Sequence, residues 1–156
     1  MVGLGRLLDA HPRLLHERAV EPACYRESGR EQYFLDPKLL WFVALNPIPD
    51  VPVPATIVDV TRVLLVRGPA QDDLDATLGL LISGAAAREA GRQLELIDAL
   101  LAAGARATPD AIDVALAHQE REAVAALLRA GYPSTAPIAA GLGRTDELPA
   151  LNIDAG

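Results

Sequence analysis

The sequence contains little cysteine, lysine or aromatic residue, and each shortage narrows the class of protein. Cys24 is the one cysteine in 156 residues, so an internal disulfide is impossible and a reducing compartment is expected. Aromatic residues make up 4% of the chain and hydrophobic residues 51%, so the core must be aliphatic. Lys38 is the one lysine beside many arginines, a bias that, with the abundant alanine, favours a bacterial protein from a GC-rich genome.

Long apolar runs and an excess of positive charge are also missing. No apolar stretch approaches the roughly 18 residues of a membrane-spanning helix. Asp9, His11 and Arg13 interrupt the region in which a signal peptide would have its apolar core. The formal net charge is -7, and acidic residues outnumber basic ones in the first, middle and last parts of the chain. We therefore expect a cytoplasmic protein that binds neither nucleic acid nor a membrane.

A short apolar pattern with spacing i, i+3 and i+4 returns along the chain. Its copies begin at Leu4, Thr61, Ile97, Val124 and Leu148. This spacing places the side chains on one face of a helix, and we expect Leu101 and Leu128 at the centre of the core. Three copies are followed by a glycine suited to a left-handed helix end: Gly68, Gly104 and Gly131. Helices that share a face and an end indicate stacked repeats.

The pattern predicts a series of helices separated by short connections. The expected helices span residues 3–10, 38–45, 55–67, two stretches within 77–103, then 110–118, 121–130, 136–142 and a last one ending near 152. Residues 17–35 and the proline-rich 46–54 are expected to be irregular, and 69–76 to form an acidic connector. We expect one domain, 1–156, with approximate units 1–20, 36–71, 77–107, 108–133 and 134–156.

Residues 110–131 resemble an ankyrin repeat. The family phrase Thr-Pro-Leu-His-x-Ala aligns with Asp110 for Thr, Ile112 for the buried Leu, Asp113 for His and Ala115 for Ala. In this alignment Asp110 caps the helix as the family threonine does. Thr108-Pro109 lies two residues earlier than the phrase requires. Similar but less complete units are found at 38–44, 77–104 and 134–144.

The resemblance implies an all-α, ankyrin-like helical-hairpin solenoid with degenerate or absent β-hairpin fingers. Tetratricopeptide-like and HEAT-like hairpin repeats are the competing folds. The ankyrin family implies a protein–protein interaction module, with another protein as partner and without cofactor or catalytic activity. The residues expected to contact the partner are Asp72, Asp73, Arg106, Thr108, Tyr132 and Ser134.

Three other functions stay open on the sequence. A small-molecule-binding or enzymatic accessory protein would have its site in the irregular region 17–54, around Trp41. A structural fragment of a larger repeat protein is a second alternative. The third is a homodimer formed through the C-terminal edge, where Leu142, Pro149 and Ile153 are expected to be exposed.

Candidate catalytic and metal-ligating residues do not form a known motif. His11 and His16 are separated by Pro12, and His118 stands apart from both. Cys24 has no recognisable histidine partner, and the acidic run at 72–75 lacks the spacing of a calcium loop. Glu120 and Glu122 are expected in a turn exposed to water, where their pKa values would not be adapted for catalysis. We therefore predict no metal, no cofactor and no catalytic residue.

Overall fold

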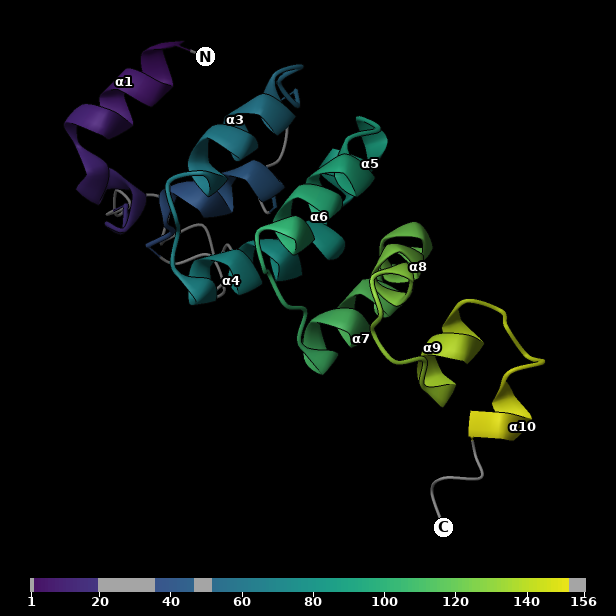
Figure 1. Cartoon of the computed structure of the whole chain (residues 1–156). Helices are drawn as coiled ribbons and strands as arrows, with labels where there is room; N and C mark the ends of the chain where they lie inside the picture. Colours follow the sequence, from purple (N-terminus) through teal and green to yellow (C-terminus); the bar gives the residue numbers. More distant parts are fainter. Residues whose placement is uncertain (1, 20–35, 47–51, 152–156) are drawn as a thin grey trace.

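The computed structural model describes residues 2–19, 36–46 and 52–151, and within this part the chain is helical and contains no strand (Figure 1). The α-helices are α1 (Val2–Ala10), α3 (Ile57–Leu65), α4 (Gln71–Ile82), α5 (Ala85–Glu89), α6 (Gln93–Ala102), α7 (Pro109–Ala117), α8 (Arg121–Arg129), α9 (Ala136–Gly141) and α10 (Leu148–Leu151). Two 3-10 helices, η1 (Pro12–Leu15) and η3 (Leu39–Ala44), complete the set. The predicted all-α class is confirmed, whereas most of the loops predicted at 17–35 and 46–54 lie outside the described residues.

The helices are arranged in two rows that follow the chain from end to end. In the first row each helix contacts the next in the order η1, η3, α4, α7 and α9. In the second row the order is α1, α3, α6 and α8. Contacts between the rows pair η3 with α3, α4 with α6, and α7 with α8. Figure 1 shows the result as an elongated array with α1 and α10 at opposite ends.

The core lies between the two rows and is aliphatic, as the composition requires. The recurring pattern supplies its centre through Leu64, Leu100 and Leu127, which are at most 1% exposed. The register differs by one residue from the prediction, because Leu101 and Leu128 are only partly buried. In the copies that begin at Thr61, Ile97 and Val124 the i and i+3 positions therefore face the neighbouring row, and the i+4 position lies at its margin. In the first copy the order is reversed, because Leu8 is 1% exposed and Leu7 is 48% exposed.

The glycines that follow the second-row helices adopt the predicted left-handed conformation. Gly104 and Gly131 have φ values of 95° and 96°. The amide of the next residue then donates back across the helix end, from Ala105 to the Leu100 carbonyl at 3.0 Å and from Tyr132 to the Leu127 carbonyl at 3.1 Å. This 6→1 hydrogen bond is the Schellman arrangement, and it satisfies carbonyls that the helix end leaves open.

The prediction of an acidic connector at 69–76 is wrong, because α4 begins at Gln71. Asp72 and Asp73 occupy its first turn, where the partial positive charge of a helix N-terminus favours carboxylates. The boundary drawn between units 36–71 and 77–107 consequently falls inside one helix. When only the sequence is considered, the polar residues at the start of a helix thus look like those of a loop.

Candidate functional site

The predicted contact residues lie along the edge where α4, α7 and α9 begin. Arg106 and Thr108 precede α7, and Tyr132 and Ser134 precede α9. Hydrogen bonds connect this edge: the Arg106 amide donates to Asp75 Oδ1 at 2.7 Å, and the Ala107 amide donates to Tyr132 Oη at 2.7 Å. The structure therefore brings these predicted residues to one side of the molecule.

Asp73 must be removed from the set of contact residues, because it is buried. It is 1% exposed, and its Oδ1 lies 2.7 Å from Nζ of Lys38, at the start of η3. Within the described residues its Oδ2 has no hydrogen-bond partner. A carboxylate removed from water needs such a cation, so Asp73 connects η3 to α4 and cannot face a partner protein.

The remaining predicted residues divide into exposed side chains and side chains used locally. Asp72 and Arg106 are exposed. Thr108, rather than Asp110, caps α7, since its hydroxyl accepts a hydrogen bond from the Ala111 amide at 3.2 Å. Ser134 is partly buried and donates to Glu147 Oε2 at 3.2 Å. The role of Thr108 is therefore at least partly structural.

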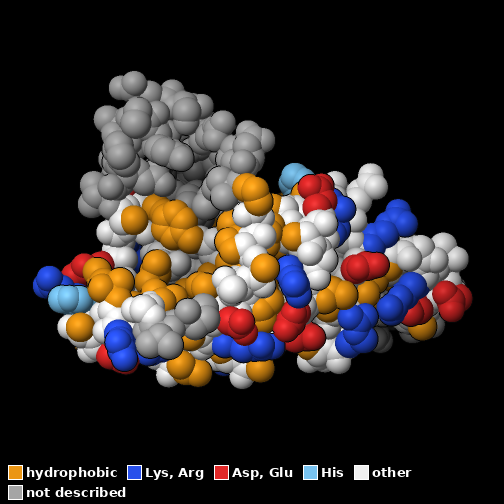
Figure 2. All heavy atoms as spheres, turned by 90° about the horizontal axis from the view of Figure 1, so that it is seen from above, with side chains coloured by type: hydrophobic (Ala, Val, Ile, Leu, Met, Phe, Trp, Pro, Cys, Tyr) orange, Lys and Arg blue, Asp and Glu red, His pale blue; other side chains and the backbone are white. Residues whose placement is uncertain are grey.

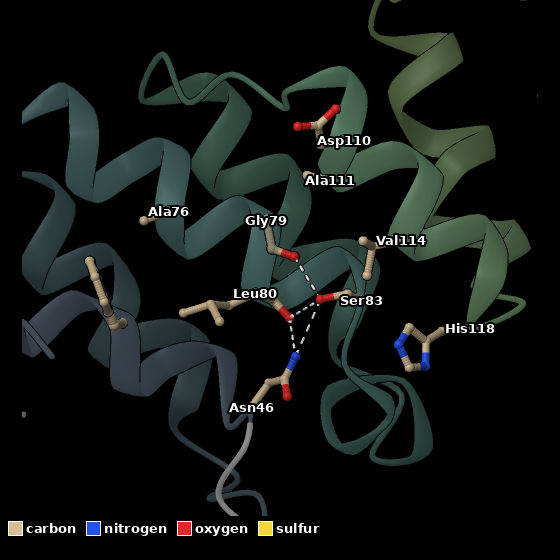
Figure 3. A pocket seen from close by; sticks show the side chains of 10 residues that line it. Asn46, Ala76, Gly79, Leu80, Ser83, Asp110, Ala111, Val114 and His118 are labelled. Carbon is tan, nitrogen blue, oxygen red and sulfur yellow. Dashed lines mark hydrogen bonds between the residues drawn. The ribbon is translucent and has the colours of Figure 1, made fainter. Parts of the chain in front are cut away.

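A hollow of about 690 Å³ opens between three first-row helices (Figure 3). Its lining residues come from η3 and its end, from α4 and from α7: Trp41, Asn46, Ala76, Gly79, Leu80, Ser83, Asp110, Ala111, Val114 and His118. Figure 3 shows Asp110 and His118 at opposite ends of the α7 wall, with Val114 between them. Val114 is 46% exposed, a large value for an apolar side chain on a helix of the array.

Small residues shape the wall that α4 contributes. Ala76, Gly79 and Ser83 share one helical face, and a Cβ added at Gly79 would lie 3.6 Å from the Ala111 Cβ. Gly79 therefore lets α7 pack closely against α4, and the small side chains of Ala76 and Ser83 extend little into the hollow. This spacing is the signal by which the sequence could have revealed the hollow, had α4 been predicted at its full length.

Asn46 and Ser83, at the η3 end of the hollow, are hydrogen-bonded within the protein. Asn46 Nδ2 donates to the Leu80 carbonyl at 2.9 Å and to Ser83 Oγ at 3.3 Å, and Ser83 Oγ donates to the Gly79 carbonyl at 2.8 Å (Figure 3). A Cβ at Gly84 would come within 2.9 Å of the Asn46 Cβ, so glycine is required for this contact. These bonds fix the wall in place and leave Asp110 and His118 as its exposed titratable groups.

A second hollow, of about 490 Å³, lies on the other side of α7, towards α9. Its lining includes Ile112 and Asp113 of α7, the predicted contact residue Tyr132, and Pro137 and Ile138 of α9. Helix α7 is therefore a ridge between two hollows. Each hollow has mainly apolar walls and one aspartate from this ridge.

Glu120 is not in a water-exposed turn, contrary to the prediction; it is 1% exposed at the start of α8. Arg88 Nε lies 3.0 Å from both of its carboxylate oxygens, and Gln93 Nε2 lies 3.1 Å from Oε2. The hydrogen bond to Glu120, followed by their charge attraction, raises the pKa of Arg88 above its ordinary value. The group connects the α5–α6 pair to the start of α8, because Arg88 belongs to α5 and Gln93 to α6.

Within the part of the chain that the structure describes, no group of three or more His, Cys, Asp or Glu side chains could hold a metal ion. Cys24 and Ile153 lie outside the described residues, so the predictions for both are untested, and Leu142 is partly buried. None of the described helices is long and apolar enough to cross a lipid bilayer. On the face shown in Figure 2, acidic and basic side chains are interspersed.

No protein-family model, no curated protein and no solved structure matches this chain.

Proposed function

We propose that the protein is a non-enzymatic protein-binding module, a cytoplasmic scaffold of the ankyrin-like helical-hairpin type. The observation that carries the proposal is the hollow on the first row, with Val114 exposed on its wall and Trp41 at its η3 end. Apolar surface that a folded chain leaves open in a concave site favours an interaction with another molecule. A partner would meet a preformed surface, so little ordering of the module would oppose binding.

The repeated local structure supports the solenoid part of the proposal. Helices α6 and α8 carry the same buried pattern and end in the same glycine turn. Ile112 and Ala115, at the positions that the ankyrin family buries, are 7% and 0% exposed. Stacked units of this kind share one continuous core because a single hairpin cannot cover its own apolar face.

Small-molecule binding is the alternative function for the same hollow, because Trp41 and Asn46 lie in the region expected for such a site. The exposed positions of Asp110 and His118 at opposite ends of the α7 wall favour a macromolecular surface, since acid–base catalysis needs titratable groups that reach the same reacting atoms. The buried carboxylates Asp73 and Glu120 are paired within the protein and do not line the hollow.

A photo-crosslinking residue placed on the wall of the hollow tests the proposal. The variant Val114→benzoylphenylalanine is expected to give a protein adduct in cells of the source organism. The matched control is Val66→benzoylphenylalanine, at an 80% exposed position just after the second-row helix α3. Equal labelling at both positions, or no adduct at position 114, would contradict binding through the hollow.

A further inference from the structure

The edge of the molecule where α4 and α7 begin is acidic. Asp72 and Asp75 belong to α4, Asp110 and Asp113 belong to α7, and neither helix contains Lys or Arg. The two helix starts are neighbours, because Gln71 Nε2 donates to the Gly104 carbonyl at 2.9 Å, in the loop that leads to α7.

The basic groups near this edge offset only part of its charge. The charge of Lys38 is balanced by buried Asp73, which leaves Arg106 as the exposed cation of the loop before α7. Arg18, whose guanidinium carbon lies 5.6 Å from the centre of the Trp41 ring, forms an isolated β-bridge with Lys38 and adds positive charge beside η3. His118 follows the last turn of α7. Along α7 itself the negative charge is therefore concentrated towards the N-terminal end, at Asp110 and Asp113.

The acidic edge and the two hollows are joined by single side chains. Asp110 lines the hollow towards α4, and Asp113 lines the hollow towards α9; both are exposed. Each apolar pocket thus has a carboxylate at its rim, and the spacing of three residues puts both carboxylates within one turn of helix. An apolar side chain in either hollow would bring its neighbours in the same segment close to a negative charge.

We propose that the two hollows receive apolar side chains of a lysine- or arginine-bearing segment of the partner protein, whose cations pair with Asp110 and Asp113. The inference rests on the proposed protein-binding function and names the chemistry of the partner. A second copy of this chain is a poor occupant, because each copy has a net charge of -7 and the copies would repel one another. Opposite charge across an interface speeds association and rejects acidic competitors.

Selection from random linear peptides displayed on phage, with the intact protein as bait, tests this chemistry. We expect the enriched peptides to combine Lys or Arg with apolar residues. When synthetic copies of these peptides that lack tryptophan bind to the protein, they should change the fluorescence emission of Trp41, the one tryptophan of the chain. Their affinity should fall as salt is raised, because the carboxylates are exposed. Enrichment of neutral or acidic peptides, or no enrichment, would overturn the proposal.

Matched aspartate variants decide whether the carboxylates of the α7 ridge bind the cations of the peptide. Asp110→Asn and Asp113→Asn should each weaken an enriched basic peptide by about two- to fivefold, the size expected for an exposed ion pair. Asp98→Asn, at an exposed position of the second-row helix α6, should leave the affinity unchanged. Equal effects at all three positions would overturn the assignment to α7. Loss of the crosslink at position 114 would instead contradict the proposed function itself, so the two failures are distinguishable.

Discussion

Arg88, in α5, and Glu120, at the start of α8, are joined by hydrogen bonds from one Nε atom to both carboxylate oxygens, each 3.0 Å long. The residues are 32 positions apart in the chain. The carboxylate is almost fully buried, whereas the Arg88 side chain is 45% exposed. One half of the pair is therefore held away from water and depends on its partners, which also include Gln93.

Glu120→Ala should destabilise the fold by about 1–3 kcal/mol, because Arg88 and the buried Gln93 amide would each lose an acceptor. Glu122→Ala is the matched control, since Glu122 is exposed one half-turn later in α8. It should change the free energy of unfolding by no more than about 0.5 kcal/mol. Urea denaturation of the three proteins gives the comparison, and similar midpoints for both variants would show that the pair is not a stabilising connection.

The second prediction concerns the Lys38–Asp73 pair. Asp73→Ala should destabilise the protein by about 1–3 kcal/mol, because the largely buried Lys38 ammonium would lose its charged acceptor. Asp72→Ala, at the exposed neighbouring position in the first turn of α4, should cost no more than about 0.5–1 kcal/mol through the helix dipole.

A double variant separates the effect of losing the ion pair on stability from the effect of losing side-chain volume. In Lys38→Met with Asp73→Leu both charges are replaced by apolar groups, and such replacements of buried pairs are often neutral or stabilising. We expect its urea midpoint to lie above that of Asp73→Ala. A double variant less stable than the single one would mean that the charges themselves hold η3 against α4.

The third prediction tests the register of the core. Leu100→Ala and Leu127→Ala should each cost about 2–5 kcal/mol, because both side chains are fully buried between the rows. Leu101→Ala and Leu128→Ala remove the same atoms from partly buried positions and should cost clearly less. Equal losses at Leu100 and Leu101 would support the register predicted from the sequence over the one in the structure.

Local signals explain why much of the helical pattern could be predicted. The spacing in α6 and α8 and the glycines after them are properties of neighbouring residues, so both helices and their ends follow from the sequence. The one-residue error at Leu101 has a different origin. The apolar positions i, i+3 and i+4 form a helical face about as wide as the buried face. Only the position of the neighbouring row of helices decides which of these side chains lies at the centre of the core.

Long-range pairs explain what could not be predicted. Asp73 looks like a loop residue because its cation, Lys38, comes from a different helix. Glu120 follows a left-handed turn at Gln119 and looks exposed until Arg88 and Gln93 are placed beside it. The larger hollow is harder still to predict, because its walls come from three separate elements, η3, α4 and α7, whose distances the sequence does not give. The small residues of α4 do mark one of its walls.

The last prediction uses a turn that the chain builds more than once. After α5 and α9 the left-handed position is occupied by glycine, at Gly91 with φ 66° and Gly143 with φ 75°. After α7 the same position holds Gln119 with φ 60°, and the next amide, of Glu120, donates back to the Ala115 carbonyl at 2.9 Å. A side chain with a Cβ is strained in this conformation by about 1–2 kcal/mol relative to a right-handed one.

Gln119→Gly should therefore stabilise the protein by about 0.5–1 kcal/mol, since relief of the strain exceeds the extra conformational freedom that glycine has in the unfolded chain. His118→Gly is the control one residue earlier, where φ is -82°. Glycine gains nothing in that right-handed conformation and should destabilise the helix end by up to about 1 kcal/mol. Urea midpoints of opposite sign relative to the parent are expected. A Gln119→Gly protein no more stable than the parent would mean that the Gln119 side chain makes a compensating contact, and that this turn is not equivalent to those at Gly91 and Gly143.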